Sequence, residues 1–215
     1  MRRSVSIGLS GLLILGAVGC GGSKEAKKGH SDPVIGSPVP TPSSTAAPKV
    51  IGSSPSTDAP FLSRIKYRLE AGTVAMAGSP AKTSVTCDKS SLPVVNGATV
   101  HCTVDYAGLA VPWTVTIKGS SSDVLVPYDA TPSTGLVTRA GVLRAFYTSK
   151  VEYGTDLRCG DLPDKALVPL GRRSQYRCQY VSKPDKSLKL GPQRITFAVI
   201  SKQRGPDFEL PYDVH

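Results

Sequence analysis

The chain of 215 residues has few of the side chains on which enzyme active sites most often depend. It contains three histidines, which are His30 in a low-complexity segment, His101 in a predicted strand and the final residue, His215. No Cys-x-x-Cys pair, His-x-x-x-His element, phosphate-binding glycine loop or nucleophile elbow is present. The sequence therefore predicts no metal site, no cofactor and no small-molecule substrate, and we expect the protein not to be an enzyme.

Long hydrophobic runs are also missing. An uncharged stretch from Val5 to Gly19 contains glycines and is shorter than the roughly 20 apolar residues that a membrane-spanning helix needs. Arg2 and Arg3 precede it, which is the arrangement of a secretory signal peptide. We therefore expect residues 1–19 to direct export and then to be removed.

The end of this signal, Leu15-Gly16-Ala17-Val18-Gly19-Cys20, resembles the lipobox of bacterial lipoproteins. The resemblance implies that Cys20 carries a diacylglyceryl lipid and anchors the chain to the extracytoplasmic face of the cell membrane. The alternative is an ordinary cleavage site that lies beside Cys20 by chance. Cysteine counting favours lipidation, because removing Cys20 from the five cysteines leaves an even number in an exported protein.

Residues 20–57 differ in composition from the rest of the chain. From Gly21 to Thr57 there are six prolines, eight serines and five glycines, and no aromatic residue. Such a segment cannot bury a core of its own. We expect it to be a disordered stalk that holds the folded part away from the membrane.

The remaining chain shows an internal repeat, predicted to span 58–131 and 135–215. Its matching landmarks keep the same order: Val85-Thr86-Cys87, Thr99 to Cys102 and Val126 to Asp129 in the first copy, and Leu157-Arg158-Cys159, Tyr176-Arg177-Cys178 and Leu210 to Asp213 in the second. Ordered matches of this kind indicate a duplicated structural unit with slightly longer connections in the second copy.

Hydrophobic periodicity predicts the same plan in each copy. Phe61, Leu62, Ile65 and Leu69 have helical spacing, and this helix is expected to end near Ala71-Gly72; Val142, Leu143, Phe146 and Tyr147 repeat the spacing. After each predicted helix, apolar residues occur at every second position, which is the pattern of a half-buried β-strand. These residues are Val100, Cys102, Val104, Tyr106, Trp113, Val115, Ile117, Tyr176, Cys178 and Tyr180. The predicted fold class is α+β, with one helix followed by an antiparallel sheet of about four strands in each copy.

Repetition also favours disulfides within each copy, Cys87 with Cys102 and Cys159 with Cys178. Four cysteines allow three connectivities, and the spacing does not exclude the other two.

Positive charge is concentrated in the second copy. Residues 135–215 contain fourteen basic and eight acidic side chains, whereas 58–130 contain six of each. The candidate residues for binding an anionic partner are Arg172, Arg173, Arg177, Lys183, Lys186, Lys189 and Arg194. An anionic envelope polymer, lipid headgroups or an acidic protein would fit such a surface, and a merely solvated face is the alternative. Nucleic acid is not expected outside the membrane.

The Val-Thr-Cys segment, the later Gly-Ala-Thr-x-x-Cys-Thr and the Pro-x-Thr-Val-Thr strand resemble a small domain of unknown function that recurs in actinobacterial lipoproteins. This resemblance implies a helix-plus-sheet domain with a disulfide and no assigned activity. The family's proline after the first cysteine is Asp88 in one copy and Gly160 in the other. The tandem layout is also similar to that of secreted beta-lactamase inhibitory proteins. We therefore predict a tethered, non-catalytic binding or envelope-associated module, with an inhibitor of a secreted or membrane enzyme as the alternative.

Overall fold

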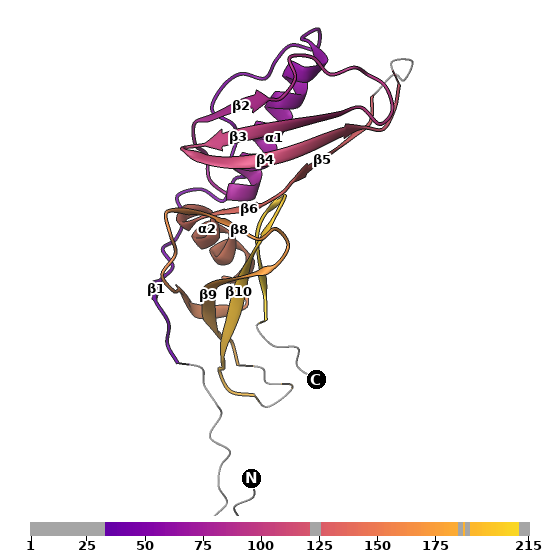
Figure 1. The fold of residues 1–215 in the computed structure, drawn as a ribbon. Helices are drawn as coiled ribbons and strands as arrows, with labels where there is room; N and C mark the ends of the chain where they lie inside the picture. The colour runs from indigo at the N-terminus through magenta and orange to yellow at the C-terminus, as the bar shows by residue number, and fades with distance from the viewer. Residues whose placement is uncertain (1–32, 121–125, 185–186, 188–189, 211–215) are drawn as a thin grey trace, which may run out of the picture. The chain divides into compact units, whose positions relative to one another are not determined.

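A computed structural model describes residues 33–120, 126–184, 187 and 190–210 (Figure 1). The described chain is α+β, with two helices and antiparallel sheets, so the predicted fold class is confirmed at this level. Its elements are β1 (Ser37–Pro38), α1 (Phe61–Ala77), β2 (Thr83–Cys87), β3 (Thr99–Tyr106), β4 (Leu109–Ile117), β5 (Tyr128–Pro132), β6 (Gly135–Thr138), α2 (Arg139–Lys150), β7 (Gly154–Cys159), β8 (Lys165–Val168), β9 (Arg173–Ser182), β10 (Arg194–Lys202) and β11 (Gly205–Glu209).

Helix α1 is longer than the sequence predicts. It passes through Gly72 and ends at Ala77, followed by Gly78 in the left-handed conformation (φ 68°) that commonly closes helices. Gly72 does not end the helix. Its missing side chain instead leaves room for the ring of Trp113. A Cβ placed on Gly72 would lie 3.1 Å from Cη2 of Trp113. The last turn stays helical because Val74 and Met76 are fully buried there.

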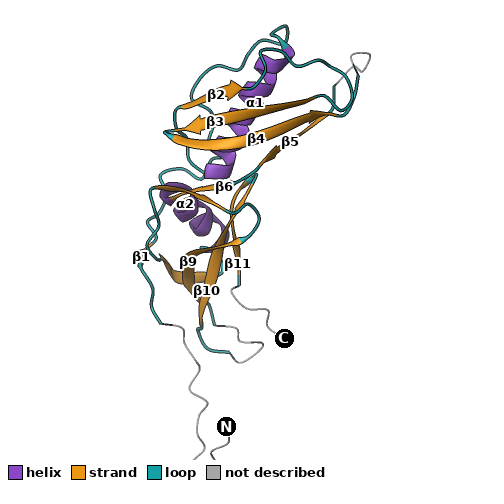
Figure 2. Cartoon of the chain, viewed as in Figure 1, coloured by secondary structure: helices purple, strands orange, loops and turns teal. Residues whose placement is uncertain are grey.

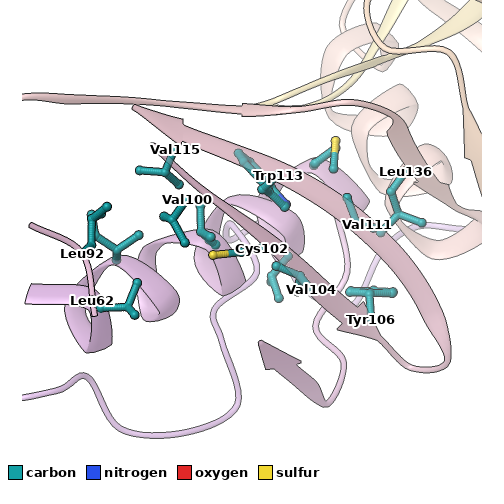
Figure 3. Packing of buried hydrophobic residues seen from close by; sticks show 14 of the residues in the cluster. Leu62, Leu92, Val100, Cys102, Val104, Tyr106, Val111, Trp113, Val115 and Leu136 are labelled. Atoms are coloured by element: carbon teal, nitrogen blue, oxygen red, sulfur yellow. The ribbon is translucent and has the colours of Figure 1, made fainter. Parts of the chain in front are cut away.

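Strands β2, β3, β4 and β5 form the first sheet, in that order and entirely antiparallel. The predicted alternation in β3 and β4 is confirmed, because one set of side chains is buried beneath α1 and the other faces outward. Ala107 and Gly108 both have positive φ, as a two-residue hairpin turn requires. Figure 3 shows the buried set, which includes Leu62, Val100, Cys102, Val104, Val111, Trp113 and Val115.

The second sheet has the order β1-β7-β9-β10-β11 and packs its inner face on α2. Phe146 of α2 contacts Phe197 of β10 and Phe208 of β11 in edge-to-face geometry. Strands β6 and β8 form a separate two-stranded ribbon. Figure 2 shows how these helices and strands are distributed along the described chain.

Both predicted disulfides are confirmed. Cys87 on β2 is bonded to Cys102 on β3, and Cys159 on β7 is bonded to Cys178 on β9. In each sheet the bond joins two directly paired residues on neighbouring antiparallel strands. The four cysteines are therefore occupied as structural cross-links.

The described part of the predicted stalk does not behave as a free linker. Ser37 and Pro38 form β1, which pairs with Cys159 and Arg158 of β7. The backbone N–H of Val39 donates to Leu157 at 2.8 Å, and the Val39 side chain packs on the second hydrophobic core. The expectation of a disordered stalk over all of 20–57 was wrong for this stretch, because a short backbone ladder and one aliphatic contact give it a fixed place that composition does not reveal.

Candidate functional site

The predicted anion-binding residues are spread over the second sheet rather than gathered at one point. Arg172 immediately precedes β9 and Arg173 begins it, Arg177 lies near its middle, and Lys183 lies just after its end. Arg194 begins β10. Lys186 and Lys189 lie outside the described residues, as does the predicted lipid-attachment residue Cys20.

Strand pairing brings two of these arginines onto one face and adds a third that the charge pattern did not single out. Gln179 of β9 stands opposite Arg158 of β7 on one side and Thr196 of β10 on the other. Arg177 lies two residues from Gln179 and therefore points to the same side. We call Arg158, Arg177 and Arg194, with Asp156 between two of them, the arginine face.

Asp156 organises this face. Its Oδ1 lies 2.7 Å from Nε of Arg158, and its Oδ2 lies 3.1 Å from an Nη of Arg194. The hydrogen bond from Arg158 is the main cause that lowers the pKa of Asp156; burial opposes it, and the hydrogen bond from Arg194 reinforces it. Asp156 also has φ 48°, at an irregularity in the pairing of β7 with β9. Aspartate is one of the few non-glycine residues that tolerate this conformation.

Arg177 is held by its own backbone surroundings. Its guanidinium donates to the carbonyl oxygen of Ser174 and, at 3.0 Å, to that of Tyr176. These carbonyl groups belong to the stretch of β9 where pairing with β10 shifts register. The arginine therefore keeps a fixed position while its charge stays at the sheet surface.

Charge balance differs across the second sheet. At the β11 edge Lys202 pairs with Asp207, and Arg173 pairs with Glu209 at 3.2 Å. The arginine face holds three cations and one carboxylate, Asp156, which pairs with Arg158 and Arg194. Arg173 therefore has a structural partner, and the uncompensated charge lies on the side of β7 and β9.

Gln179 lies on the arginine face between Arg158 and Thr196, but it is not exposed to solvent. Its side chain is fully buried. With the amide turned so that both atoms have suitable partners, it donates to Pro33 at 3.1 Å and accepts from the N–H of Ile35 at 2.5 Å. Arg158 also donates to the carbonyl oxygen of Gly36 at 3.3 Å. Residues 33–36 thus cross the arginine face and cover its centre.

Arg158 and Asp156 do not stand out in the sequence, because neither lies in a region of high local positive charge. The two lie two positions apart in a strand, which is the spacing that puts side chains on one face. That spacing was the available indication, but the bulge that lets Asp156 reach both arginines has no evident sequence mark.

The other singled-out side chains have ordinary structural surroundings. Trp113 is 5% exposed, and its indole N–H donates to Oγ1 of Thr73 at 3.0 Å, so it belongs to the core. His101 is exposed on β3, with its ring 3.3 Å from the hydroxyl of Thr114. Among the described residues, no group of three or more potential metal ligands comes together.

A pocket of about 1010 Å³ lies between residues 40–49 and the N-terminal half of α2. Arg139 and Arg144 line it, but Arg139 pairs with Asp164 and Arg144 donates to the carbonyl oxygen of Ala46. These contacts hold the segment in place, and none of the described residues that line the space has a buried polar side chain without a partner.

Within the described part of the chain, neither helix is long and apolar enough to cross a bilayer. No protein-family model matches the chain, and no curated protein or solved structure is significantly similar to it.

Proposed function

We propose that the protein is a membrane-tethered extracytoplasmic lipoprotein that acts as a non-catalytic binding module for an anionic partner. The single observation that carries this proposal is the arginine face, where Arg158 and Arg194 flank the carboxylate of Asp156 and Arg177 lies on the same side of the sheet. Guanidinium groups suit this role because they stay charged and bind carboxylate or phosphate through two donors at once.

The state of these arginines supports a binding role over a merely solvated surface. The side chains of Arg158 and Arg194 are only 26% and 16% exposed. Arginines that are already held by neighbouring groups lose less conformational freedom when an anion binds than mobile surface lysines do. The proposed anion-binding residues are therefore Arg158, Arg177 and Arg194, in place of the seven basic residues that the charge pattern predicts.

The disulfides support the proposed location. Such bonds persist in oxidising surroundings outside the cytoplasm, and two of them cross-link the described chain. Anchoring through a lipid on Cys20 rests on the resemblance of the signal to a lipobox, and membership of the actinobacterial lipoprotein family remains a prediction.

We also infer that the two halves are tandem repeats. Support comes from sheet order: β2-β3-β4-β5 follows α1, and β7-β9-β10-β11 follows α2. A disulfide joins the first two strands of each series. The added strand β8 accounts for the longer connection in the second copy, where the bonded cysteines are 19 residues apart instead of 15.

Affinity capture tests the proposed function. Chains of residues 21–215 are immobilised and exposed to native envelope extract, and retained material is analysed after low-salt and high-salt washes. We expect anionic material to be retained at low salt and released at high salt, because exposed charge attraction is screened over a few ångströms as salt rises. The triple variant Arg158→Gln/Arg177→Gln/Arg194→Gln should retain less. Equal retention by both chains would count against the proposal.

An inhibitor of a secreted or membrane enzyme is the second candidate. The observation that favours it is the outer face of the first sheet, which is exposed and rich in small polar side chains such as Thr86, Thr114 and Thr131. A packed protein interface on this face would survive the high-salt wash. Retention of one enzyme through that wash, lost in a Thr114→Arg variant and kept in the arginine variants, would favour inhibition.

A further inference from the structure

The segment that precedes the first helix is built to dock on the second sheet. Gly36 has φ 51°, and a Cβ at this position would overlap the carbonyl oxygen of Cys159. Only glycine fits both conditions without displacement. Together with the pairing of β1 on β7 and the bonds from Gln179, this glycine holds residues 33–39 against the second sheet.

Docking shortens the connection to the proposed anchor. Only thirteen residue steps separate Cys20 from Pro33, whereas the predicted stalk extended to residue 57. A flexible chain of that length has a typical end-to-end distance of about 20 Å, and full extension allows about 45 Å. The residues between Cys20 and Pro33 include Lys24, Lys27 and Lys28.

We propose that the arginine face rests on anionic phospholipid headgroups of the leaflet in which Cys20 is anchored, so that the lipid and the second sheet form a two-part membrane attachment. This inference rests on the proposed function and names its partner.

The chemistry of the face suits headgroup phosphates. Guanidinium groups pair with phosphate through parallel N–H donors. The side chain of Val34, next to Pro33, is 58% exposed. It offers an apolar contact to the headgroup region of the membrane. Basic residues close to a lipid anchor add electrostatic attraction to anionic lipids. The short connection holds the arginines at high local concentration near the surface.

The test uses the chain of residues 21–215, which retains every described residue and lacks the lipid. Its partitioning is measured by co-sedimentation with vesicles of pure phosphatidylglycerol and of pure phosphatidylcholine. We expect binding to phosphatidylglycerol only. The triple variant Arg158→Gln/Arg177→Gln/Arg194→Gln should bind at least tenfold more weakly, because each basic residue near an anionic surface contributes about fivefold.

Two matched variants separate charge from folding. Arg64→Gln/Lys66→Gln/Arg68→Gln removes three cations from α1 and should bind as the unchanged chain does. Arg158→Lys/Arg177→Lys/Arg194→Lys keeps the charge and should retain most of the binding even where the fork-shaped contacts are lost. Thermal unfolding of all chains establishes that they are folded.

The outcomes also separate this inference from the proposed function. Equal loss in the α1 variant, or no loss in the arginine-to-glutamine variant, overturns the membrane contact. If the arginine-to-glutamine variant still binds vesicles but no longer binds purified anionic wall polymer, the membrane inference fails and the proposed function stands. If it binds both as before, both fail.

Discussion

The hydroxyl of Thr138 joins the two helices of the described chain: Oγ1 donates to the carbonyl oxygen of Ala77 at 2.9 Å and accepts from the N–H of Gly141 at 3.0 Å. Thr138 is thus the N-cap of α2 and also a partner for the last residue of α1. Gly141 makes this approach possible, because a Cβ there would overlap the Ala77 carbonyl.

Replacement of Thr138 by valine should lower the free energy of unfolding by about 2 kcal/mol, since it removes an N-cap and leaves a buried carbonyl without its donor. Thr138→Ser keeps the hydroxyl and should cost much less. Urea denaturation followed by far-ultraviolet circular dichroism measures both. A valine variant as stable as the serine variant would contradict a dominant contribution from the hydroxyl.

The buried pair of Trp113 and Thr73 gives a second prediction. Thr73 Oγ1 accepts from the indole at 3.0 Å and donates to the Leu69 carbonyl at 2.9 Å. Thr73→Val should destabilise the protein by about 1–3 kcal/mol, because a buried indole N–H is left without an acceptor. Trp113 is the only tryptophan in the sequence, so its fluorescence reports directly on this site. Thr73→Ser is the control, and a valine variant as stable as the serine variant would refute the argument.

Periodicity was sufficient to predict the parts of the fold in which local sequence and tertiary packing agree. The alternation from Val100 to Tyr106 is strict, so one face of β3 is buried as expected. The predicted end of α1 near Gly72 was wrong. An isolated glycine in a sequence is typical of a helix end, but this glycine instead makes space for Trp113. That contact lies 41 residues away in sequence and leaves no local mark.

The candidate site was less predictable for a similar reason. Charge counting found Arg177 and Arg194, but their grouping with Arg158 depends on strand order, and the cover over Gln179 depends on a segment whose composition indicates disorder. Proline and serine content describes how poorly a segment folds alone. It does not describe whether another sheet edge will pair with it.

Docking of that segment is the basis of the third prediction. Gly36→Ala should detach residues 33–39, because the new methyl group overlaps Cys159 and the backbone has positive φ. The N–H of Val39, now bonded to Leu157, should then exchange with deuterium much faster, while the unfolding midpoint changes little. Gly191→Ala is the control, since nothing lies within 4 Å of a Cβ at that position. Unchanged protection at Val39 would show that the glycine is not required.

The last prediction concerns acid stability and Asp156. Because the hydrogen bond from Arg158, reinforced by that from Arg194, holds the pKa of Asp156 in the folded state below its ordinary value, the folded state binds fewer protons than the unfolded state in this range. The ionised carboxylate therefore stabilises the fold above the ordinary carboxyl pKa of about 4, and this contribution is lost as the pH falls toward the lower folded value.

Asp156→Asn should accordingly reduce the fall in unfolding free energy between about pH 5 and about pH 2, which the pKa shift of this group spans. The reduction should be less than about 1 kcal/mol, because the side chain of Asp156 is 35% exposed and solvent screens its ion pairs. Asparagine also tolerates the positive φ at this position, so backbone strain does not confuse the comparison. Asp129→Asn, which removes a carboxylate paired with a single lysine at 3.2 Å, is the matched control. If the two variants show the same pH dependence, the two arginines beside Asp156 do not lower its pKa.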